Sequence, residues 1–198
     1  MKSLLILGAG GFGHMIQETA MQLGYEKVSF LDDAVKDPLV VGKCCDYRDF
    51  LDSYEAAVAA LGDNGMRLYW TEKLMEAGYQ VPALIHPSAV VSPSAVIGQG
   101  SFVLQRAVVN THTVVEHGVL INSGAVVDHD SYIASGAHIG LGSVVKSNCT
   151  IASKRKVEAG EVIFSTRRKI DGVSDRNLED AIYAFGFGPR CSYVKPFG

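Results

Sequence analysis

The sequence predicts a mixed protein: a small N-terminal α/β domain with a Rossmann-like βαβ unit, followed by a parallel β-helix. Three observations predict it. An aliphatic residue recurs at every sixth position through the second half of the chain. Four positions after most of these aliphatic residues stands a small residue. Near the N-terminus, a glycine-rich loop separates an apolar run from a helical pattern. A fixed repeat period is typical of solenoids, whereas a single strand–loop–helix indicates an α/β unit.

The six-residue repeat runs without insertion from Ile85 to Ile163. Three hexads would form a triangular coil of eighteen residues, with each aliphatic side chain pointing inward and stacking on its copies in adjacent coils. An α-helix is excluded, because six is not a helical period and the segment is rich in Val, Thr and Gly. The aliphatic positions are Ile85, Val91, Ile97, Val103, Val109, Val115, Ile121, Val127, Ile133, Ile139, Val145, Ile151, Val157 and Ile163.

The small residues of the repeat are expected at the corners of the coil, where a larger side chain would clash. Val119 is the larger exception, and glycines near the turns supply a permissive backbone. Each coil buries its apolar face only against its neighbours, so the array is the stable unit. The small positions are Ala89, Ala95, Ser101, Ala107, Thr113, Ala125, Ser131, Ala137, Ser143 and Cys149.

The N-terminal segment predicts one βαβ unit. A strand over residues 2–7 leads into the glycine loop, a helical pattern runs from Met15 to Leu23, and a second strand covers 27–31. Further along, residues 55–61 suggest a helix or a strand, and 68–77 suggest a helix. We therefore expect three parts: a Rossmann-like domain over 1–83, the β-helix over 84–164, and a capping helix (175–185) with a tail over 165–198.

The loop satisfies G-x-G-x-x-G through Gly8, Gly10 and Gly13, with Asp32 or Asp33 at the ribose-binding distance. Only about 80 residues precede the repeats, which is too few for the two halves of a full dinucleotide fold. The loop therefore favours a nucleotide diphosphate, which backbone N–H groups and the helix dipole attract. A small NAD-linked enzyme and a purely structural glycine turn are the alternatives.

Composition narrows the function classes. A formal charge of −3 disfavours a nucleic-acid partner, and no segment is long enough to span a membrane. The cysteines match no zinc or redox pattern, so we expect free, buried thiols in a reducing cytoplasm. No metal is expected, because the short run Asp128–Asp130 supplies few ligands in useful directions. The four cysteines are Cys44, Cys45, Cys149 and Cys191.

Together these motifs resemble one family: the bacterial hexapeptide-repeat acetyltransferases that modify UDP-linked amino sugars (the bacillosamine pathway), and their sialic-acid O-acetyltransferase relatives. The resemblance covers about 165 residues. The residues that carry it are the glycine loop, Phe30-Leu31-Asp32-Asp33, Gly62-x-Asn64-x-x-Arg67, Leu84-Ile85-His86-Pro87-Ser88-Ala89 and Ala125-Val126-Val127-Asp128-His129-Asp130.

The resemblance implies left-handed coils, a homotrimer with active sites between subunits, and a cytoplasmic acetyl-CoA-dependent N- or O-acetyltransferase. The acceptor would be a nucleotide-linked amino sugar, with UDP as the nucleotide, used in surface glycan biosynthesis. His129 would be the general base, and Asp130 would raise its basicity and fix its tautomer. Asn122 would lie near the substrate, and His138 would contact the acyl donor.

The remaining substrate-binding positions come from the same resemblance. Gly10, Gly11 and Phe12 match the substrate loop of the family. Asp32 and Asp33 match groups that hold the nucleotide, and Gly62 is expected to be a further substrate-binding position. His14 would border the phosphates, whereas His86, His112 and His117 are expected to be structural or exposed.

Two departures from the family pattern define the runner-up function. The family commonly has histidine where this chain has Phe12, and the C-terminal third is altered. The basic runs 154–156 and 167–169 are either solvated corners or contacts to coenzyme A phosphates from a neighbouring subunit. The alternative is a non-catalytic nucleotide-sugar-binding relative with a degenerate coenzyme A groove.

Overall fold

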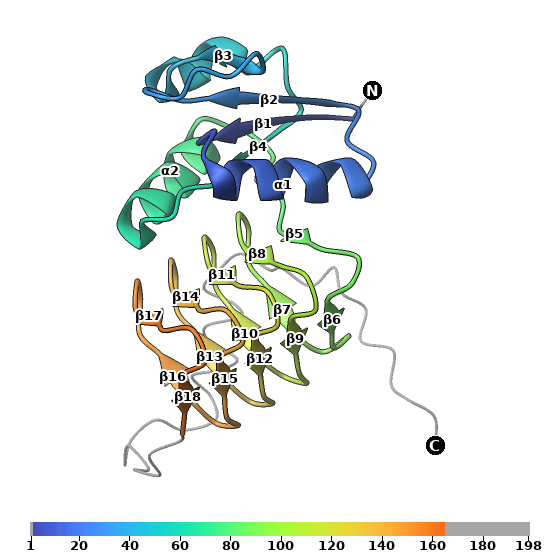
Figure 1. The fold of residues 1–198 in the computed structure, drawn as a ribbon, viewed down its shortest axis with the longest axis vertical. Coiled ribbons are helices and arrows are strands. Elements are labelled where there is room, and N and C mark those ends of the chain that lie inside the picture. The colour runs from blue at the N-terminus through green and yellow to red at the C-terminus, as the bar shows by residue number, and fades with distance from the viewer. Residues whose placement is uncertain (1, 165–198) are drawn as a thin grey trace. The chain divides into compact units, whose positions relative to one another are not determined.

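A computed structural model describes residues 2–164, which form an α/β layer followed by a β-helix (Figure 1). The predicted fold class is confirmed: a small α/β domain precedes a left-handed parallel β-helix. The predicted division at residues 83 and 84 stays a prediction. The predicted capping helix, the basic run 167–169 and Cys191 lie outside the described residues.

The α/β layer is a four-stranded parallel sheet of order β3-β2-β1-β4. Residues 55–61 contain a strand rather than a helix. The elements in chain order are β1 (Ser3–Leu7), α1 (Gly11–Gln22), β2 (Lys27–Leu31), β3 (Val40–Gly42), the 3-10 helix η1 (Cys44–Phe50), β4 (Ala56–Ala59) and α2 (Asn64–Glu76).

Both helices begin earlier than their apolar patterns predict. α1 starts at Gly11 rather than Met15, because the helix begins inside the glycine loop, where low helix propensity hides its start. α2 starts at Asn64 rather than Leu68, because Asp63 is its N-cap and accepts a 2.8 Å hydrogen bond from the Met66 N–H. The glycine loop is therefore directly continuous with the first turn of α1.

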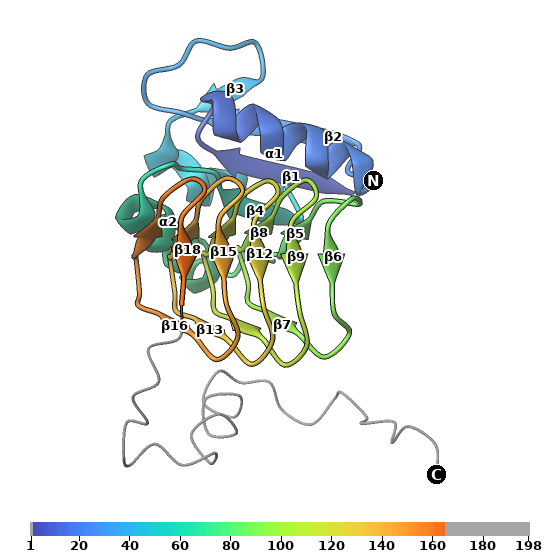
Figure 2. The same cartoon turned by 60° about the horizontal axis from the view of Figure 1, so that its bottom comes forward.

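The β-helix is built from strands of two residues each, which stack into three parallel sheets (Figure 2). We call them the docked sheet (β5, β8, β11, β14, β17), the valine sheet (β6, β9, β12, β15, β18) and the third sheet (β7, β10, β13, β16). Their bounds are β5 (Leu84–Ile85), β6 (Val90–Val91), β7 (Val96–Ile97), β8 (Phe102–Val103), β9 (Val108–Val109), β10 (Val114–Val115), β11 (Leu120–Ile121), β12 (Val126–Val127), β13 (Tyr132–Ile133), β14 (His138–Ile139), β15 (Val144–Val145), β16 (Thr150–Ile151), β17 (Lys156–Val157) and β18 (Val162–Ile163).

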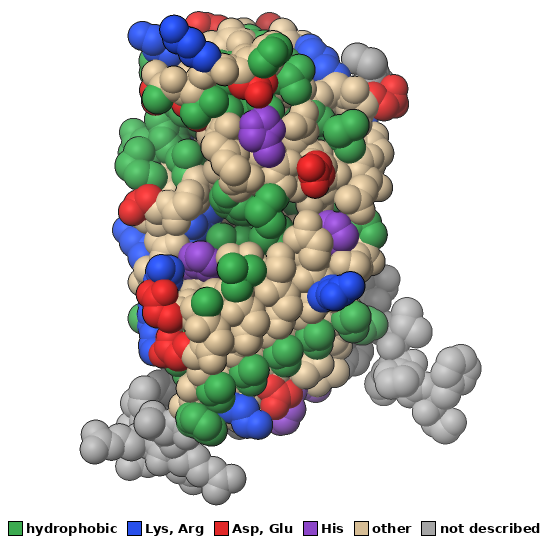
Figure 3. All heavy atoms as spheres, in the orientation of Figure 1, with side chains coloured by type: hydrophobic (Ala, Val, Ile, Leu, Met, Phe, Trp, Pro, Cys, Tyr) green, Lys and Arg blue, Asp and Glu red, His purple; other side chains and the backbone are tan. Residues whose placement is uncertain are grey.

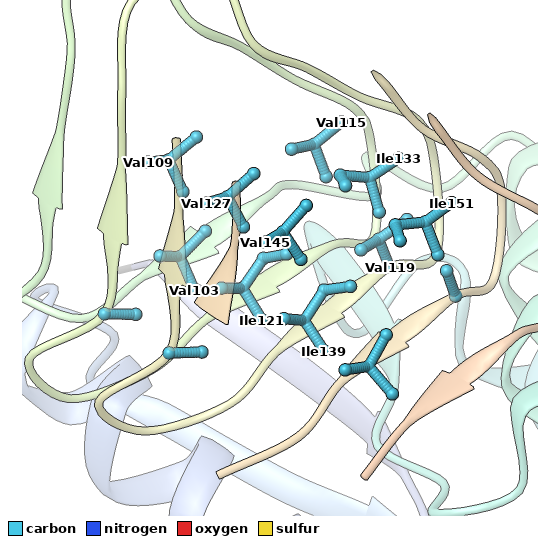
Figure 4. Close-up of a cluster of buried hydrophobic side chains, with 14 of the residues drawn as sticks. Val103, Val109, Val115, Val119, Ile121, Val127, Ile133, Ile139, Val145 and Ile151 are labelled. Carbon is cyan, nitrogen blue, oxygen red and sulfur yellow. The ribbon is translucent and has the colours of Figure 1, made fainter. Parts of the chain in front are cut away.

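The inward stacking predicted from the repeat is confirmed. The second residue of each strand points into the prism, and Ile121, Ile133 and Val157 are among the side chains that are fully buried (Figure 4). The end positions Ile85 and Ile163 are only partly buried, because a terminal coil has a neighbour on one side. The larger exception Val119 is also fully buried in this core.

The α/β layer lies against the docked sheet. The outward residues Leu84, Phe102 and Leu120 are buried in the same apolar cluster as Ile16 of α1. α2 lies over a corner of the prism, where an added Cβ at Gly100 or Gly136 would crowd its side chains. The left-handed φ of these glycines, +64° and +69°, is a second reason that glycine occupies them.

The valine sheet carries an unusual outward face. Its outward residues are all valine and are paired in register from coil to coil. At the two ends, Val90 is 62% and Val162 44% exposed. Figure 3 shows a row of hydrophobic side chains along the lower edge of this view. The five residues are Val90, Val108, Val126, Val144 and Val162.

The prediction of buried thiols is right for Cys44 and Cys149 and wrong for Cys45, which is free but exposed. The first two face apolar interior, whereas Cys45 lies on the outer side of η1, next to Asp46. Within residues 2–164, every helix is too short or too polar to cross a membrane.

The inward stacking predicts the cost of a cavity. Ile121→Ala should lower the free energy of unfolding by about 2–5 kcal/mol, because the fully buried side chain leaves a void in the prism. Leu141→Ala, at a 53% exposed corner position, should change it by less than about 0.5 kcal/mol. Urea unfolding of both variants measures the difference, and equal effects would contradict the assigned inward direction.

Candidate active site

His129 and Asp130 form a hydrogen-bonded pair at the corner between β12 and β13. The distance from His129 Nδ1 to Asp130 Oδ2 is 2.6 Å, and both side chains are about half exposed. Asp130 has a φ of 54°, a left-handed value that aspartate tolerates better than most residues. The corner conformation thus places the carboxylate beside the ring. The same carboxylate lies 3.4 Å from Nδ1 of His112 in the adjacent coil.

The hydrogen bond that His129 donates to Asp130 raises the pKa of His129, and the negative charge of Asp128 adds to this effect. When the ring is neutral and donates Nδ1–H to Asp130, its Nε2 is left as a proton acceptor. Asp128 Oδ1 accepts from the His129 N–H at 2.9 Å and from Asn110 Nδ2 at 3.1 Å. The pair therefore has the geometry of a general base with an orienting carboxylate.

A second polar pair lies on the docked sheet. Asn122 Nδ2 is 3.2 Å from His138 Nε2, and Asn122 Oδ1 accepts from the Ser123 N–H at 2.8 Å. Burial lowers the pKa of His138 to about 4, and the nearby cations of Arg67 and Lys156 act in the same direction. His138 is therefore a neutral imidazole at neutral pH.

The glycine loop contains two kinds of glycine. Gly13 has no room for a side chain, because a Cβ there would overlap the carbonyl oxygen of Gly8, whose own φ is +102°. Gly10 and Gly11 have open space in the direction that a Cβ would take, as does Gly62 after β4. Because β1 and β4 are neighbours in the sheet, these open glycines lie at the carboxyl ends of adjacent parallel strands. Ligands of α/β sheets bind at such a crevice, where the strand order reverses.

The two aspartates after β2 are already engaged with the backbone. Asp32 Oδ2 accepts from the Ala9 N–H at 2.8 Å, and Oδ1 accepts from Ala34 and Val35. Burial alone would raise the pKa of Asp32, but these N–H groups outweigh it and lower the pKa. Asp33 Oδ1 accepts from the Cys44 N–H at 3.1 Å. Asp32 therefore shapes the glycine loop directly.

Phe12 and His14 have partners on the surrounding elements. The Phe12 ring packs edge-on against Phe102 of the docked sheet, with centroids 5.3 Å apart. The His14 ring lies 5.0 Å from Phe30, and its Nε2 is 3.6 Å from Asp37 Oδ2. Phe12 thus joins the loop to the β-helix rather than extending into the open side of the loop.

The predicted residues lie in three groups. Gly10, Gly11 and Gly62 lie at the carboxyl ends of β1 and β4, and Asn122 pairs with His138 on the docked sheet. His129 and Asp130 lie at the corner between the valine sheet and the third sheet, which is the corner opposite the docked sheet. Within residues 2–164, no hydrogen bond or ion pair joins the His129 pair to either group. Figure 3 shows a hollow with hydrophobic and histidine side chains between the α/β layer and the β-helix.

Sequence reasoning missed two features. Arg67 was noted only as part of a motif, yet it is a completely buried side chain with five acceptors. Glu116 accepts hydrogen bonds from Tyr132 and Ser135 at another corner, where no repeat signal marks it. The spacing Gly62-x-Asn64-x-x-Arg67 was the available signal for the first. Among the described residues, no three His, Cys, Asp or Glu side chains gather as a metal site.

Comparisons with known proteins agree with this architecture. A family model described as the PglD N-terminal domain matches residues 3–74. The acetyltransferase domain of PglB from Neisseria gonorrhoeae FA1090, solved in complex with acetyl coenzyme A, is 33% identical with a TM-score of 0.74. That match covers 82% of this chain and 92% of the solved chain.

Perosamine N-acetyltransferase from Caulobacter crescentus gives a similar match. A variant with one histidine-to-asparagine substitution, in complex with CoA and GDP-perosamine, is 27% identical with a TM-score of 0.73. The match covers 83% of this chain and 89% of that one. The unsubstituted protein, PerB, in complex with the same two molecules, gives the same identity and TM-score.

The His129 pair predicts a titration. Asp130→Asn should lower the pKa of His129, because it removes the hydrogen-bonded carboxylate that raises it. Asp128→Asn is the matched control: it removes the other flanking charge, keeps the Asp130 bond, and should lower the pKa less. Histidine-selective NMR titration measures both, and a larger fall in Asp128→Asn would contradict the assignment of Asp130 as the principal partner.

Proposed function

This chain belongs to the bacillosamine- and perosamine-type sugar N-acetyltransferases, and from that membership we propose a specific reaction with His129 as its general base. An acetyl group passes from acetyl-CoA to the amino or hydroxyl group of a UDP-linked amino sugar. The observation that carries the proposal is the His129–Asp130 pair, which lies at a corner of the uninterrupted β-helix. Its Nδ1 hydrogen bond to Asp130 leaves Nε2 of His129 available as a proton acceptor. The product would serve surface glycan synthesis.

The proposed reaction needs one base and no metal. The acceptor nitrogen or oxygen attacks the thioester carbonyl carbon, and His129 Nε2 removes the proton that this atom loses. The new C–N or C–O bond forms, the C–S bond breaks, and the proton passes from the imidazolium to the departing sulfur of coenzyme A. Asp130 stabilises the imidazolium while it exists, through the 2.6 Å hydrogen bond at Nδ1.

The sheet crevice is the proposed nucleotide site. The N–H groups in the first turn of α1 and the open space at Gly10 and Gly11 suit a diphosphate. Gly62 borders the same crevice from the β4 side. Asp32 contributes by holding the loop through Ala9, and Asp33 by anchoring the start of η1. Both support the nucleotide site, and Phe12 fixes the loop against the β-helix.

Asn122 and His138 form the proposed contact for the sugar and the acyl donor. Asn122 would face the sugar side and His138 the acyl-donor side. A neutral imidazole can accept from Asn122 at Nε2 and donate its other ring N–H to a carbonyl oxygen of the acyl donor. The exposed corner at Lys154–Lys156 offers cations for the phosphates of coenzyme A, although Lys156 and Arg155 already face Glu158 and Glu161.

We propose that the site is completed between copies of this chain in a homotrimer. The separation of the His129 corner from the sheet crevice supports this, because one chain holds the base and the nucleotide site on opposite sides of its prism. The exposed valine sheet supplies an apolar surface for a second copy, with Val90 and Val162 the most exposed of its residues. A closed cyclic assembly would then bring one chain's His129 to another chain's nucleotide.

The cytoplasm is the proposed compartment. Free thiols at Cys44, Cys45 and Cys149 fit a reducing environment, in which acetyl-CoA and nucleotide sugars are also found.

A non-catalytic nucleotide-sugar-binding protein is the runner-up. It is favoured by Phe12, which uses its side chain for packing where the family commonly has a histidine. It is weakened by the β-helix core, which stays fully buried as far as Val157, beyond the point where the repeat becomes less regular in sequence. The NAD alternative is not supported, because the α/β sheet has only four strands.

Substitution of the base separates these functions. His129→Ala should reduce acetyl transfer by roughly 10²–10⁴-fold, the usual contribution of a general base. His112→Ala removes the other histidine at this corner, which occupies the place of Asp130 one coil earlier, and should retain most activity because His129 keeps its own bond to Asp130. Release of free thiol from acetyl-CoA, with a panel of UDP- and GDP-linked amino sugars, gives the rate. Clean nucleotide-sugar binding without turnover by the wild type would instead support the binding protein.

A further inference from the structure

Arg67 is the largest completely buried side chain of the described residues, and it carries a charge. It projects from the first turn of α2. Burial lowers the pKa of its guanidinium to about 10, which still leaves it protonated at neutral pH. Among residues 2–164, no carboxylate pairs with it; Asp63 acts on it only at a distance. A buried cation without an anionic partner is costly, so its presence calls for a specific role.

The guanidinium donates only to neutral oxygen atoms. Two of them belong to the α/β layer: Leu61 O at 3.1 Å and Asn64 Oδ1 at 2.9 Å. Three belong to the β-helix: Gly118 O at 2.9 Å, Gly136 O at 2.8 Å and Ala137 O at 3.2 Å.

The coils contacted in this way are consecutive. Gly118 and Gly136 occupy the same corner one coil apart, and Asn64 extends the series by donating to Lys154 O at 2.9 Å. All three corner residues have left-handed φ values, between 58° and 69°. Arg67 and Asn64 thus fasten the segment after Gly62 to three successive coils.

His138 follows directly after the two carbonyl groups that Arg67 Nη2 holds. Its ring is oriented by Asn122, whose amide direction is set because Oδ1 accepts from the Ser123 N–H. Asn122 Nδ2 must then donate to His138 Nε2, so the neutral ring carries its proton on Nδ1. Among the described residues no group accepts from this Nδ1–H, which leaves it free to meet a ligand.

We propose that Arg67 is a positioning residue: by holding the Gly136 and Ala137 carbonyl groups, it fixes His138 as a neutral donor on the acyl-donor side of the site. The charged groups that face His138 are Arg67 from α2, Lys156 from β17 and Glu158 beyond it. Arg67 and Lys156 disfavour a cationic ring, and Glu158 opposes them. The link to acetyl-CoA rests on the proposed function, whereas the link between Arg67 and His138 does not.

Histidine-selective ¹⁵N NMR tests this inference without any activity. In the wild type, the His138 ring should stay neutral down to about pH 5 with its proton on Nδ1. In Arg67→Met, the titration midpoint of His138 should rise by about one pH unit or more. A rise of one unit raises the ratio of cationic to neutral ring tenfold at a given pH. Lys73→Met removes a charge from the exposed side of the same helix and should leave the midpoint unchanged.

Activity adds a second readout. The KM for acetyl-CoA of Arg67→Met should rise more steeply than that of the wild type as pH falls from 6.5 to 4.5, while that of Lys73→Met follows the wild type. A wild-type His138 that titrates near its ordinary value, or carries its proton on Nε2, would overturn the inference even if Arg67→Met fails to fold. An unchanged midpoint in folded Arg67→Met would overturn it too. Inactivity of every variant with the expected NMR result would instead count against the proposed function.

Discussion

The inward aliphatic residue at every sixth position is the constraint on which the rest of the structure depends. Because each coil uses eighteen residues, positions eighteen apart occupy the same place in successive coils, as His112 and Asp130 do at one corner. The core therefore decides which residues face outward on a sheet and which stand at a corner. His129 is at a corner and His138 is on the docked sheet, because the repeat leaves them no other place.

This constraint also places His129 and His138 in different surroundings. The docked sheet is covered by α1 through Phe102 and Leu120, so the glycine loop at the start of α1, where we propose that the nucleotide binds, lies on that side of the prism. The His129–Asp130 pair lies at the opposite corner, where both side chains are half exposed. The Asp130 carboxylate raises the pKa of His129. The two histidines consequently differ in basicity: the Asp130 hydrogen bond raises the pKa of His129, whereas burial and neighbouring cations lower the pKa of His138. This difference suits the two proposed roles, a base for His129 and a hydrogen-bond donor for His138.

How much the sequence could predict follows from the strength of each local signal. The inward series was predictable residue by residue, because burial in a prism permits only aliphatic side chains there. The start of α1 was not, because Gly11 and Gly13 have low helix propensity, and the need for glycine at position 13 comes from its close approach to Gly8 in the folded chain. The role of Arg67 could not be predicted, because three of its acceptors are carbonyl groups 51 to 70 residues away in the sequence. Asp32 was expected to hold the nucleotide, but its backbone partners emerge only when the loop after β1 meets the end of β2.

The most direct test of the account is complementation between two inactive variants. His129→Ala removes the proposed base, and Gly10→Phe fills the proposed nucleotide site from a position whose φ of −76° and open surroundings accept a side chain. If one chain's base acts on another chain's nucleotide, mixed assemblies of the two variants should transfer acetyl groups well above either variant alone. Mixed assemblies that form but remain as inactive as the separate variants would contradict a site shared between copies.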